Sequence, residues 1–483
     1  MSRLVVISNR VSAPRNRGEG ATGGLAMALS AALREHNGVW FGWSGQTAET
    51  YTGKVTIEEV AGVTVATIDL ESQDVDEYYN GYANSVLWPL FHYRPDLTDF
   101  ERLFSEGYER ANLRFAEAIG PLLRDDDVIW VHDYHLIPLG RELRRRGHMN
   151  RIGFFLHIPW PPRRLLTTLP GHQDLVDAML YYDLLGFQTE DHLTAFEEYI
   201  EQEADGELLN RRRARAAGQE ARLGAFPIGL DTQDFQEAAK GPNAIAAYER
   251  AKASFAGRQM IVGVDRLDYS KGLEERFIAY EQFLNDNPAL HEEVFMLQIA
   301  IPSREQVKAY QEIRARLEGI SGNINGAFST IDWVPLRYVN REYRRDELAG
   351  VYRAARVGLI TPLRDGMNLV AKEYVAAQDP EDPGVLILSQ FAGAASQMHE
   401  ALIVNPYNRE ELADAIRQAL EMPLDERIER WTALMEGVLR DDVEAWRDAF
   451  VEALTRTSRK GFIEKARERI AGFGRGLGSS PPA

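Results

Sequence analysis

Residues 360–378 read ITPLRDGMNLVAKEYVAAQ, and this stretch indicates the fold most clearly. An apolar strand leads into a turn at Asp365 and Gly366, and a helix is expected to begin near Met367. Unpaired N–H groups at the start of a helix attract the oxygens of a sugar or a diphosphate. Glu373 follows about two turns later, where its carboxylate can accept hydrogen bonds from both hydroxyls of a ribose. A strand, a turn and a helix in this order form the repeating unit of an α/β domain.

The same alternation of strands and helices extends along the rest of the chain. Apolar runs without polar alternation predict strands that are buried on both faces, and they lie at residues 4–7, 128–131, 152–156 and 385–388. Helical spacing of apolar residues is found near residues 25–37, 277–284 and 412–420. We therefore predict an α/β fold with two doubly wound, Rossmann-like domains that face one another across a cleft.

A domain boundary is expected near residue 235. The polar stretch at residues 201–222 interrupts the first series of strands and helices, and a second series begins at residues 260–264. The predicted division places the domains at residues 1–235 and 236–455, followed by a helix and tail at 456–483. For this last segment we expect a disordered end, and a return across to the first domain is one expectation for its helix.

Composition limits the classes of partner. The chain has 483 residues, no cysteine and a formal net charge of −18. A strongly acidic protein repels phosphate backbones and anionic lipids, so neither nucleic acid nor a membrane is an expected partner. The longest apolar run, residues 152–160, is too short to span a membrane, and residues 4–7 are too few for a signal peptide. We predict a cytoplasmic protein, in which any anionic substrate needs a local cluster of arginine and lysine.

Residues 8–25 read SNRVSAPRNRGEGATGGL and join a predicted strand to a helix. The pair Gly23 and Gly24 allows the backbone to approach a ligand closely, and the amides at the helix start favour phosphate. Arg10 and Arg17 add positive charge to the same loop. A simple turn with solvated arginines explains the pattern equally well, so both interpretations stay open at this point.

Residues 127–136 read DVIWVHDYHL and bring three possible metal ligands together, His132, Asp133 and His135. Neighbouring residues on a strand point to opposite faces, and the spacing is not that of a helical zinc motif, so we predict no metal site. A carboxylate at the end of a strand is suited to contact a sugar hydroxyl or to act as a base, which makes Asp133 a candidate. His157 ends the next predicted strand and is expected at the same edge of the sheet.

Residues 265–273 read DRLDYSKGL and follow the strand that opens the second half. Arg266 and Lys271 place two cations in one short loop, which is what a departing diphosphate needs as its charge develops. Asp268 lies between them and is expected to neutralise one of the two. A salt-bridged turn without a ligand is the structural alternative.

These segments occur together with YYNGYANSVLWPLFHYRP at residues 78–95 and GFFLHIPWPP at residues 153–162. In this combination, and over nearly its whole length, the chain resembles the trehalose-6-phosphate synthase family of retaining GT-B glycosyltransferases. The resemblance implies transfer of glucose from a nucleotide-diphosphate glucose to glucose-6-phosphate, with no cofactor and no metal. It also implies a homo-oligomer, either a dimer or a tetramer. The first domain would bind the acceptor and the second the nucleotide sugar.

The resemblance also implies a role for individual residues. On the side of the nucleotide sugar these are Gly24, Arg266, Lys271, Arg345, Asp365, Met367, Asn368, Leu369, Val370 and Glu373. On the side of glucose-6-phosphate they are Arg10, Tyr79, Trp88, Asp133 and Arg304. The residues expected at the reacting centre are Arg266, Lys271, His157, Asp133 and Asp365, with the His157 carbonyl facing the anomeric carbon.

No carboxylate nucleophile is evident, so retention implies a front-face route in which the departing phosphate oxygen takes the proton of the acceptor. Two other functions remain as alternatives. One is an inverting transferase that uses Asp133 as its base, and the other is a non-catalytic sensor of sugar phosphates. Because the protein carries a net charge of −18, binding of a dianionic sugar phosphate requires that Arg10 and Arg304 converge in one pocket.

Overall fold

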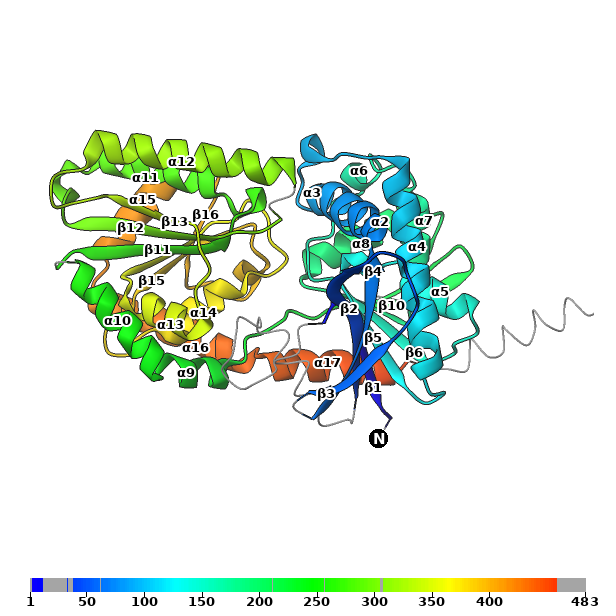
Figure 1. Ribbon diagram of the computed structural model, residues 1–483. Helices are drawn as coiled ribbons and strands as arrows, with labels where there is room; N and C mark the ends of the chain where they lie inside the picture. The colour runs from blue at the N-terminus through cyan, green and yellow to red at the C-terminus, as the bar shows by residue number, and fades with distance from the viewer. Residues whose placement is uncertain are drawn as a thin grey trace, which may run out of the picture.

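Two separate β-sheets organise the chain, one in each half (Figure 1). The structure is a computed structural model that describes residues 2–11, 33, 38–60, 62–210, 212–255, 257–304 and 307–457. We call the ten-stranded sheet with its helices the N-lobe and the six-stranded sheet with its helices the C-lobe. The predicted α/β fold with two doubly wound sheets is confirmed.

The N-lobe sheet is parallel at its centre and antiparallel at both edges. In spatial order its strands are β3 (Thr56–Val60), β4 (Val63–Glu71), β2 (Val39–Ala48), β1 (Leu4–Arg10), β5 (Val128–His132), β6 (Arg151–Phe155), β7 (Leu184–Phe187), β10 (Gln219–Ala225), β9 (Arg213–Ala216) and β8 (Glu207–Leu208). Only the pairs β3·β4, β9·β10 and β8·β9 are antiparallel. The strand order reverses direction between β1 and β5, which makes this the topological switch point of the sheet.

The edge of this sheet corrects one prediction. Residues 201–222 were expected to interrupt the first series of strands, but β8, β9 and β10 continue it, and β10 pairs in parallel with β7. Along β9, exposed arginines at Arg213 and Arg215 alternate with buried alanines at Ala214 and Ala216. This period of two is typical of a half-buried strand, and the high charge of the segment concealed it.

The C-lobe sheet is parallel throughout. In spatial order its strands are β13 (Leu336–Val339), β12 (Val294–Ile301), β11 (Gln259–Arg266), β14 (Val357–Ile360), β15 (Val385–Ser389) and β16 (Leu402–Val404). This is the order of a dinucleotide-binding fold, with its switch point between β11 and β14. We call the segment after β11, residues 267–272, the β11 loop, and the segment after β14, residues 361–368, the β14 loop.

Helices cover the sheets as the α/β pattern requires. The helices of the N-lobe are α2 (Ser72–Asp74), η1 (Val75–Leu87), α3 (Trp88–Phe91), η2 (Pro95–Leu97), α4 (Arg102–Ile119), η3 (Gly120–Leu122), η4 (Tyr134–Leu136), α5 (Leu139–Arg145), α6 (Arg163–Leu166), α7 (His172–Met179) and α8 (Glu190–Gln202). Those of the C-lobe are α9 (Thr232–Ala239), α10 (Pro242–Phe255), η5 (Tyr269–Lys271), α11 (Leu273–Asp286), η6 (Pro288–Leu290), α12 (Lys308–Phe328), α13 (Arg345–Ala354), α14 (Leu369–Ala377), η7 (Gly393–Ser396), α15 (Arg409–Glu421) and α16 (Leu424–Arg440). In Figure 1, α11, α12 and α15 lie above the C-lobe sheet, and α10, α13, α14 and α16 lie below it.

Most of the predicted elements are present in the structure. The apolar runs at residues 4–7, 128–131, 152–156 and 385–388 fall on β1, β5, β6 and β15, so these strands are confirmed. The helices expected near residues 277–284 and 412–420 lie within α11 and α15. The helix expected near residues 25–37 lies outside the described residues, apart from Leu33, which is buried.

Within the described residues the chain passes between the lobes twice. After α16 it returns to the N-lobe as α17 (Val443–Thr455), which crosses the lower part of Figure 1 and packs against β6 and β7. The helix begins where the Asp442 side chain accepts a hydrogen bond from Ala445 N at 2.8 Å. Its Phe450 ring stacks on Trp130 with centroids 4.6 Å apart, so the helix completes the core of the N-lobe.

Candidate active site

The β11 loop and the β14 loop meet at the switch point of the C-lobe sheet. Lys271 Nζ donates to Asp365 Oδ2 at 2.5 Å, and Leu363 N donates to Ser270 O at 2.8 Å. Ligands of open α/β sheets bind outside the carboxyl ends of the strands at this position. Two segments that are about ninety residues apart in the sequence therefore join at the point where the fold places a ligand.

Asp365 is surrounded by basic side chains, with Lys271 as its direct partner. Burial alone would raise its pKa, but the neighbouring Lys271 ammonium holds the pKa of this carboxyl below its ordinary value. Asn368 Nδ2 donates a further hydrogen bond to Asp365 Oδ2 at 3.1 Å. The carboxylate is therefore ionised at neutral pH, and it can accept hydrogen bonds from the hydroxyls of a sugar.

The start of α14 presents backbone amides next to this pair. Asn368 precedes the helix with φ 80° and ψ 84°, and its side chain does not cap the helix. The first residues of the helix, Leu369 and Val370, are half-buried, so their amides are the groups available to an anion. The Met367 side chain is only 3% exposed and packs in the core, so this residue can offer a ligand only its main chain.

Glu373 and Arg345 form the deeper part of the same site. Arg345 Nε lies 3.8 Å from Glu373 Oε1, while Arg345 Nη1 contacts Asp234 Oδ2 at 2.6 Å. Burial raises the pKa of Glu373 to about 7, against the opposing effect of the Arg345 charge. Within the described part of the chain, Nε and Nη2 of Arg345 are buried without a hydrogen-bond partner. This pair of side chains can therefore offer both an acceptor and donors to polar groups of a ligand.

Arg266 reaches from the C-lobe towards the N-lobe. It is exposed at the end of β11, and its guanidinium lies 5.1 Å from the centre of the Trp88 ring. Asp268, which was expected to neutralise Arg266 or Lys271, instead pairs with Arg304 at 3.4 Å. Although burial opposes ionisation, the surrounding cations, led by Arg304, lower the pKa of Asp268 to about 2. The contact partner of Asp268 is thus Arg304, and Lys271 pairs with Asp365 instead.

Asp133 occupies the switch point of the N-lobe sheet, directly after β5. Its backbone has φ 75° and ψ 165°, a conformation that costs a non-glycine residue about 1–3 kcal/mol and is found mainly at functional sites. Burial raises the pKa of its carboxyl to about 6. Asp133 Oδ1 accepts a hydrogen bond from His157 N at 3.1 Å, which joins the ends of two neighbouring strands.

His157 lies where the backbones of the two lobes come close together. Its Nε2 is hydrogen-bonded to His132 Nδ1 at 3.0 Å, and burial lowers the pKa of His157 to about 3, so the ring is neutral. A Cβ atom added to Gly366 would lie 2.0 Å from the His157 carbonyl oxygen. Gly366 is therefore required because the backbones of the two lobes touch here, and the carbonyl expected to face the sugar lies beside the Asp365 turn.

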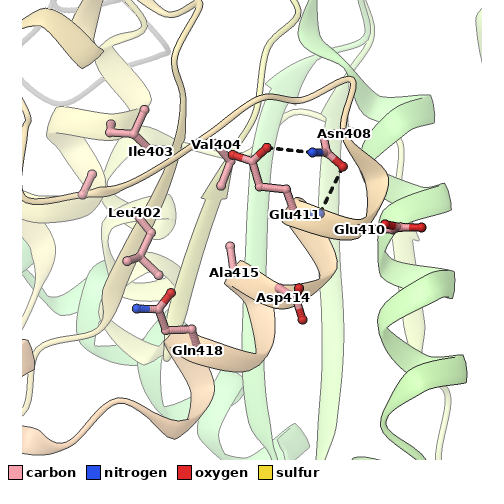
Figure 2. Close-up of a pocket in the computed structure, with 10 residues that line it drawn as sticks. Leu402, Ile403, Val404, Asn408, Glu410, Glu411, Asp414, Ala415 and Gln418 are labelled. Atoms are coloured by element: carbon pink, nitrogen blue, oxygen red, sulfur yellow. Dashed lines mark hydrogen bonds between the residues drawn. The ribbon is translucent and has the colours of Figure 1, made fainter.

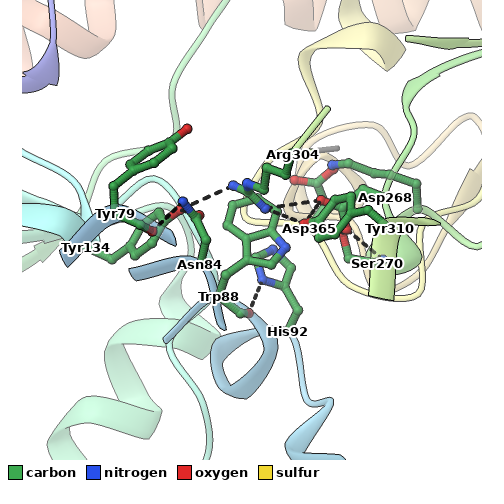
Figure 3. A network of polar contacts seen from close by, with 11 residues as sticks. Tyr79, Asn84, Trp88, His92, Tyr134, Asp268, Ser270, Arg304, Tyr310 and Asp365 are labelled. Carbon is green, nitrogen blue, oxygen red and sulfur yellow. Dashed lines mark hydrogen bonds and ion pairs between the residues drawn. The ribbon is translucent and has the colours of Figure 1, made fainter. Parts of the chain in front are cut away.

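Aromatic rings of the N-lobe form the opposite wall, shown in Figure 3. Arg304 comes from the C-lobe and lies 3.8 Å from the centre of the Trp88 ring. Its Nη2 donates to the Tyr134 hydroxyl at 3.2 Å. Tyr79 stacks on His135 with centroids 5.8 Å apart and an angle of 13° between the rings. Trp88 and Tyr79 thus line the junction, and Arg304 connects this wall to the β11 loop.

Arg10 lies at the other end of this wall. Its guanidinium is 5.9 Å from the centre of the Trp43 ring, which in turn contacts Tyr79 with centroids 5.7 Å apart. Arg304 lies at Trp88 and Tyr134, and the rings of Tyr79 and His135 lie between it and the Arg10 end. The convergence of Arg10 and Arg304 in one pocket stays a prediction.

Some predicted site residues lie outside the described part of the chain, and the structure adds two residues that were not predicted. Gly24, Arg17 and most of the segment at residues 8–25 lie outside the described residues. Trp43 and Tyr134 were not predicted for the site, although Tyr134 belongs to the quoted VHDYHL motif. Trp43 carried no signal, because an aromatic residue in a buried strand is usually part of the core.

The described residues offer no metal site and no membrane-spanning helix, and they form a sizeable cavity away from the predicted site. In that part of the chain no group of three or more His, Cys, Asp or Glu side chains is placed to hold a metal ion. Among the same residues, no helix is both long enough and apolar enough to cross a membrane. A cavity of about 520 Å³ opens between β16 and α15, and none of the predicted site residues lines it (Figure 2). Its lining includes Glu410, Glu411 and Asp414, which disfavour an anionic ligand.

Comparisons with known proteins identify the family of the chain. Residues 2–456 match the family described as Glycosyltransferase family 20. The chain is 48% identical over 460 residues to a trehalose-6-phosphate synthase of Sinorhizobium fredii, and the match covers 95% of this chain and 99% of that protein. A Burkholderia xenovorans alpha,alpha-trehalose-phosphate synthase (UDP-forming), solved in complex with glucose-6-phosphate, has a TM-score of 0.90 at 48% identity, covering 94% of this chain and 100% of that one. An Escherichia coli relative bound with UDP-2-fluoro glucose has a TM-score of 0.91 at 46% identity, covering 95% and 100%.

Proposed function

The chain belongs to glycosyltransferase family 20, and on this premise we propose that glucose is transferred at the junction between its two lobes. The protein is a retaining glycosyltransferase with a GT-B fold that makes α,α-trehalose 6-phosphate from a nucleotide-diphosphate glucose and glucose-6-phosphate. The observation that best supports this location is the contact of Lys271 with Asp365 at 2.5 Å, with Arg266 and Arg304 set against Trp88 of the opposite lobe.

On the donor side, Arg266, Lys271 and the amides at the start of α14 hold the diphosphate. Lys271 exchanges its carboxylate partner for a phosphate oxygen, and Asp365 is then free to accept from the glucose hydroxyls. Glu373 accepts the ribose hydroxyls, and Arg345 lies beside it on the nucleotide side. The Escherichia coli relative bound with UDP-2-fluoro glucose supports uridine as the base of the donor.

On the acceptor side, Arg10 and Arg304 bind the phosphate of glucose-6-phosphate while Tyr79 and Trp88 cover the sugar. A guanidinium can bind two phosphate oxygens at once, and aromatic faces pack well on the C–H surface of a pyranose. Asp133 contacts a sugar hydroxyl from the end of β5. The Burkholderia xenovorans relative in complex with glucose-6-phosphate supports this acceptor.

The proposed chemistry proceeds on one face of the donor sugar. The bond from the anomeric carbon to the diphosphate oxygen breaks, and the anomeric hydroxyl of glucose-6-phosphate forms the new bond on the same face. The proton of that hydroxyl passes to the departing phosphate oxygen. Arg266, Lys271 and the helix amides stabilise the negative charge on the leaving group. Neutral His157 and ionised Asp365 orient the glucose.

Proton NMR of the product tests the reaction. UDP-glucose and glucose-6-phosphate are incubated with the protein, and the anomeric signals and the released UDP are followed. We expect an α,α linkage. A β linkage would support the inverting alternative with Asp133 as base, and no release of nucleotide would support a non-catalytic sensor. Initial rates with uridine, guanosine and adenosine diphosphate glucose test the choice of base.

Three further assignments belong to this proposal. We place the division between the acceptor-binding and donor-binding domains near residue 235, with residues 456–483 as a separate C-terminal segment. We expect a homo-oligomer, dimer or tetramer, which light scattering of the purified protein would measure. We also propose a cytoplasmic location, because both substrates carry phosphate charges that keep them in the compartment where they are made; cell fractionation tests this.

A further inference from the structure

Arg276 lies directly beneath the β11 loop and the β14 loop, on the first turn of α11, and is fully buried. Arg276 Nη1 donates to Asp265 Oδ2 at 2.5 Å, and the two side chains are 0% and 2% exposed. Arg276 Nε donates to Thr361 Oγ1 at 3.0 Å, and Nη2 donates to Lys271 O at 3.3 Å. One guanidinium is thus bonded to the end of β11, the start of the β14 loop and the residue that carries the loop cation.

These bonds occur where the sheet itself provides none. The pairing of β11 with β14 is confined to Ile261 opposite Val357 and Val262 opposite Gly358. By contrast, β11 pairs with β12 along its whole length, as far as Arg266. Beyond the two pairs of β11 with β14, the carboxyl ends of these strands are unpaired with each other, and backbone hydrogen bonds resume in the loops, where Leu363 N donates to Ser270 O at 2.8 Å. Arg276 spans the unpaired stretch between the strand pairing and the loops.

The surroundings are shaped to admit the guanidinium. A Cβ atom added to Gly263 would lie 2.7 Å from Arg276 Nη1 and 2.3 Å from Gln298 Oε1. Gln298 Oε1 in turn accepts from Arg276 Nη1 at 2.8 Å. A buried ion pair of this kind is seldom more stable than a packed apolar pair, because both charges lose their hydration. Stability alone therefore does not explain why a charge is placed here.

We propose that Arg276 is a positioning residue for glucosyl transfer, which sets the distance between the β11 loop and the β14 loop. It acts through its hydrogen bonds to the Lys271 carbonyl and the Thr361 hydroxyl. These bonds hold the Lys271 and Asp365 side chains at the separation at which both can contact the donor. This inference rests on the proposed function, because it assumes that these two side chains contact the donor.

Substitution of Thr361 tests the proposal while the buried charges of Arg276 and Asp265 are both kept. Thr361→Val removes the hydroxyl that accepts from Arg276 Nε, whereas Thr361→Ser keeps it. We expect kcat to fall about tenfold in Thr361→Val, with the KM for glucose-6-phosphate unchanged, and to remain near the wild-type value in Thr361→Ser. Equal kcat in the two variants would overturn the proposal.

Arg276→Lys tests the branched geometry, since one ammonium cannot reach Asp265, Thr361 and the Lys271 carbonyl together. We expect kcat to fall about 10-fold to 100-fold. The matched control is Arg427→Lys, which alters another buried arginine of the C-lobe whose Nη1 contacts Asp382 Oδ1 at 2.6 Å. The control should lower Tm and leave kcat unchanged. If Arg276→Lys lowered Tm and left kcat unchanged, as expected for the control, the role of Arg276 would be structural only. If Arg276→Lys does not fold, the kcat values of the two Thr361 variants decide between the positioning role and a structural one.

Lys271→Ala separates this inference from the proposed function. Normal turnover in Lys271→Ala would refute the role of Lys271 itself. A large loss in Lys271→Ala combined with normal turnover in Thr361→Val would refute only the role of Arg276.

Discussion

We call the C-lobe side of the junction the donor wall and the N-lobe side the acceptor wall. Different contacts hold these two walls in place. On the C-lobe side, charged groups brace one another, as in Lys271 with Asp365 and Arg276 with Asp265. On the N-lobe side, rings pack on rings, as Tyr79 does on His135. A charged contact in a dry site fixes both distance and direction, whereas a ring contact contributes about 0.5–1.5 kcal/mol and tolerates sliding.

This difference follows from what each substrate requires. The donor develops negative charge on its leaving group during the reaction, and the stabilising charges must already be in place when it does. The acceptor keeps its charge on a phosphate remote from the new bond, and its sugar needs mainly a surface to rest on. We therefore expect substitutions on the donor wall to change kcat and substitutions on the acceptor wall to change KM.

Lys271→Ala should give the largest effect on the donor wall. Removal of the ammonium leaves the departing diphosphate without one of its two cations, and kcat should fall by about 100-fold or more. Steady-state rates measured with both substrates saturating check this. Lys240→Ala, at an exposed lysine of the same lobe, is the matched control and should behave as wild type. A kcat close to the wild-type value in Lys271→Ala would remove Lys271 from the site.

Gly366→Ala should come next, because it tests the contact between the walls. The added methyl group would collide with the His157 carbonyl oxygen, so the lobes cannot meet as closely, and kcat should fall about 10-fold to 100-fold. Gly319→Ala is the control, since a Cβ atom there meets nothing within 4 Å. Equal kcat in the two variants would show that this approach is not needed for transfer.

Arg304 comes from the C-lobe, but it lies against Trp88 of the acceptor wall and is proposed to bind the acceptor phosphate. The effect of Arg304→Ala should therefore appear in KM. Loss of its charged hydrogen bonds to the phosphate should raise the KM for glucose-6-phosphate about tenfold and alter the KM for the donor less. Arg304→Lys keeps the charge but loses the branched set of N–H donors, so its KM for glucose-6-phosphate should lie between those of the wild type and Arg304→Ala. An unchanged KM for glucose-6-phosphate in Arg304→Ala would place the phosphate elsewhere.

Asp133→Asn should give the smallest effect, a change in the pH dependence of stability. Burial raises the pKa of Asp133 to about 6 in the folded protein, above its ordinary value of 3.8. The folded protein therefore holds a proton that the unfolded chain has lost between these values, and this contribution to stability falls as the pH rises through that window. Asp133→Asn has no carboxyl to ionise and so does not lose this stability at high pH. Its Tm should therefore exceed that of the wild type by about 2 °C at pH 8. At pH 4 the difference should vanish; a constant difference would indicate another cause.

Much of the donor wall could be predicted from the sequence, because its signals are local. Arg266 and Lys271 follow one apolar run and Asp365 follows another, and the carboxyl ends of adjacent parallel strands meet at one edge. The β5 strand and the position of Asp133 at its end were predictable for the same reason. Local patterns of this kind specify both an element and the side of the sheet at which it ends.

The remaining features depend on residues that are distant in the sequence. Arg276 occupies a position on α11 that helical spacing alone does not mark as buried, and only Gly263 and Gln298 on two strands make room for it. The partner of Asp268 is Arg304, which follows a different strand. Such pairs form only when three separate elements pack together. They produce no repeating pattern within any one stretch of sequence, so the sequence does not predict them.

The return of α17 to the N-lobe has a consequence for biosynthesis. Trp130 stacks on Phe450 and Phe155 lies against Trp446, so these rings stay uncovered until residues 443–455 have left the ribosome. At about 5–20 residues per second, the roughly 200 residues between β10 and α17 take about 10–40 s to translate. During that interval the nascent N-lobe displays apolar rings to which a chaperone can bind. A messenger truncated within the C-lobe would leave them permanently exposed.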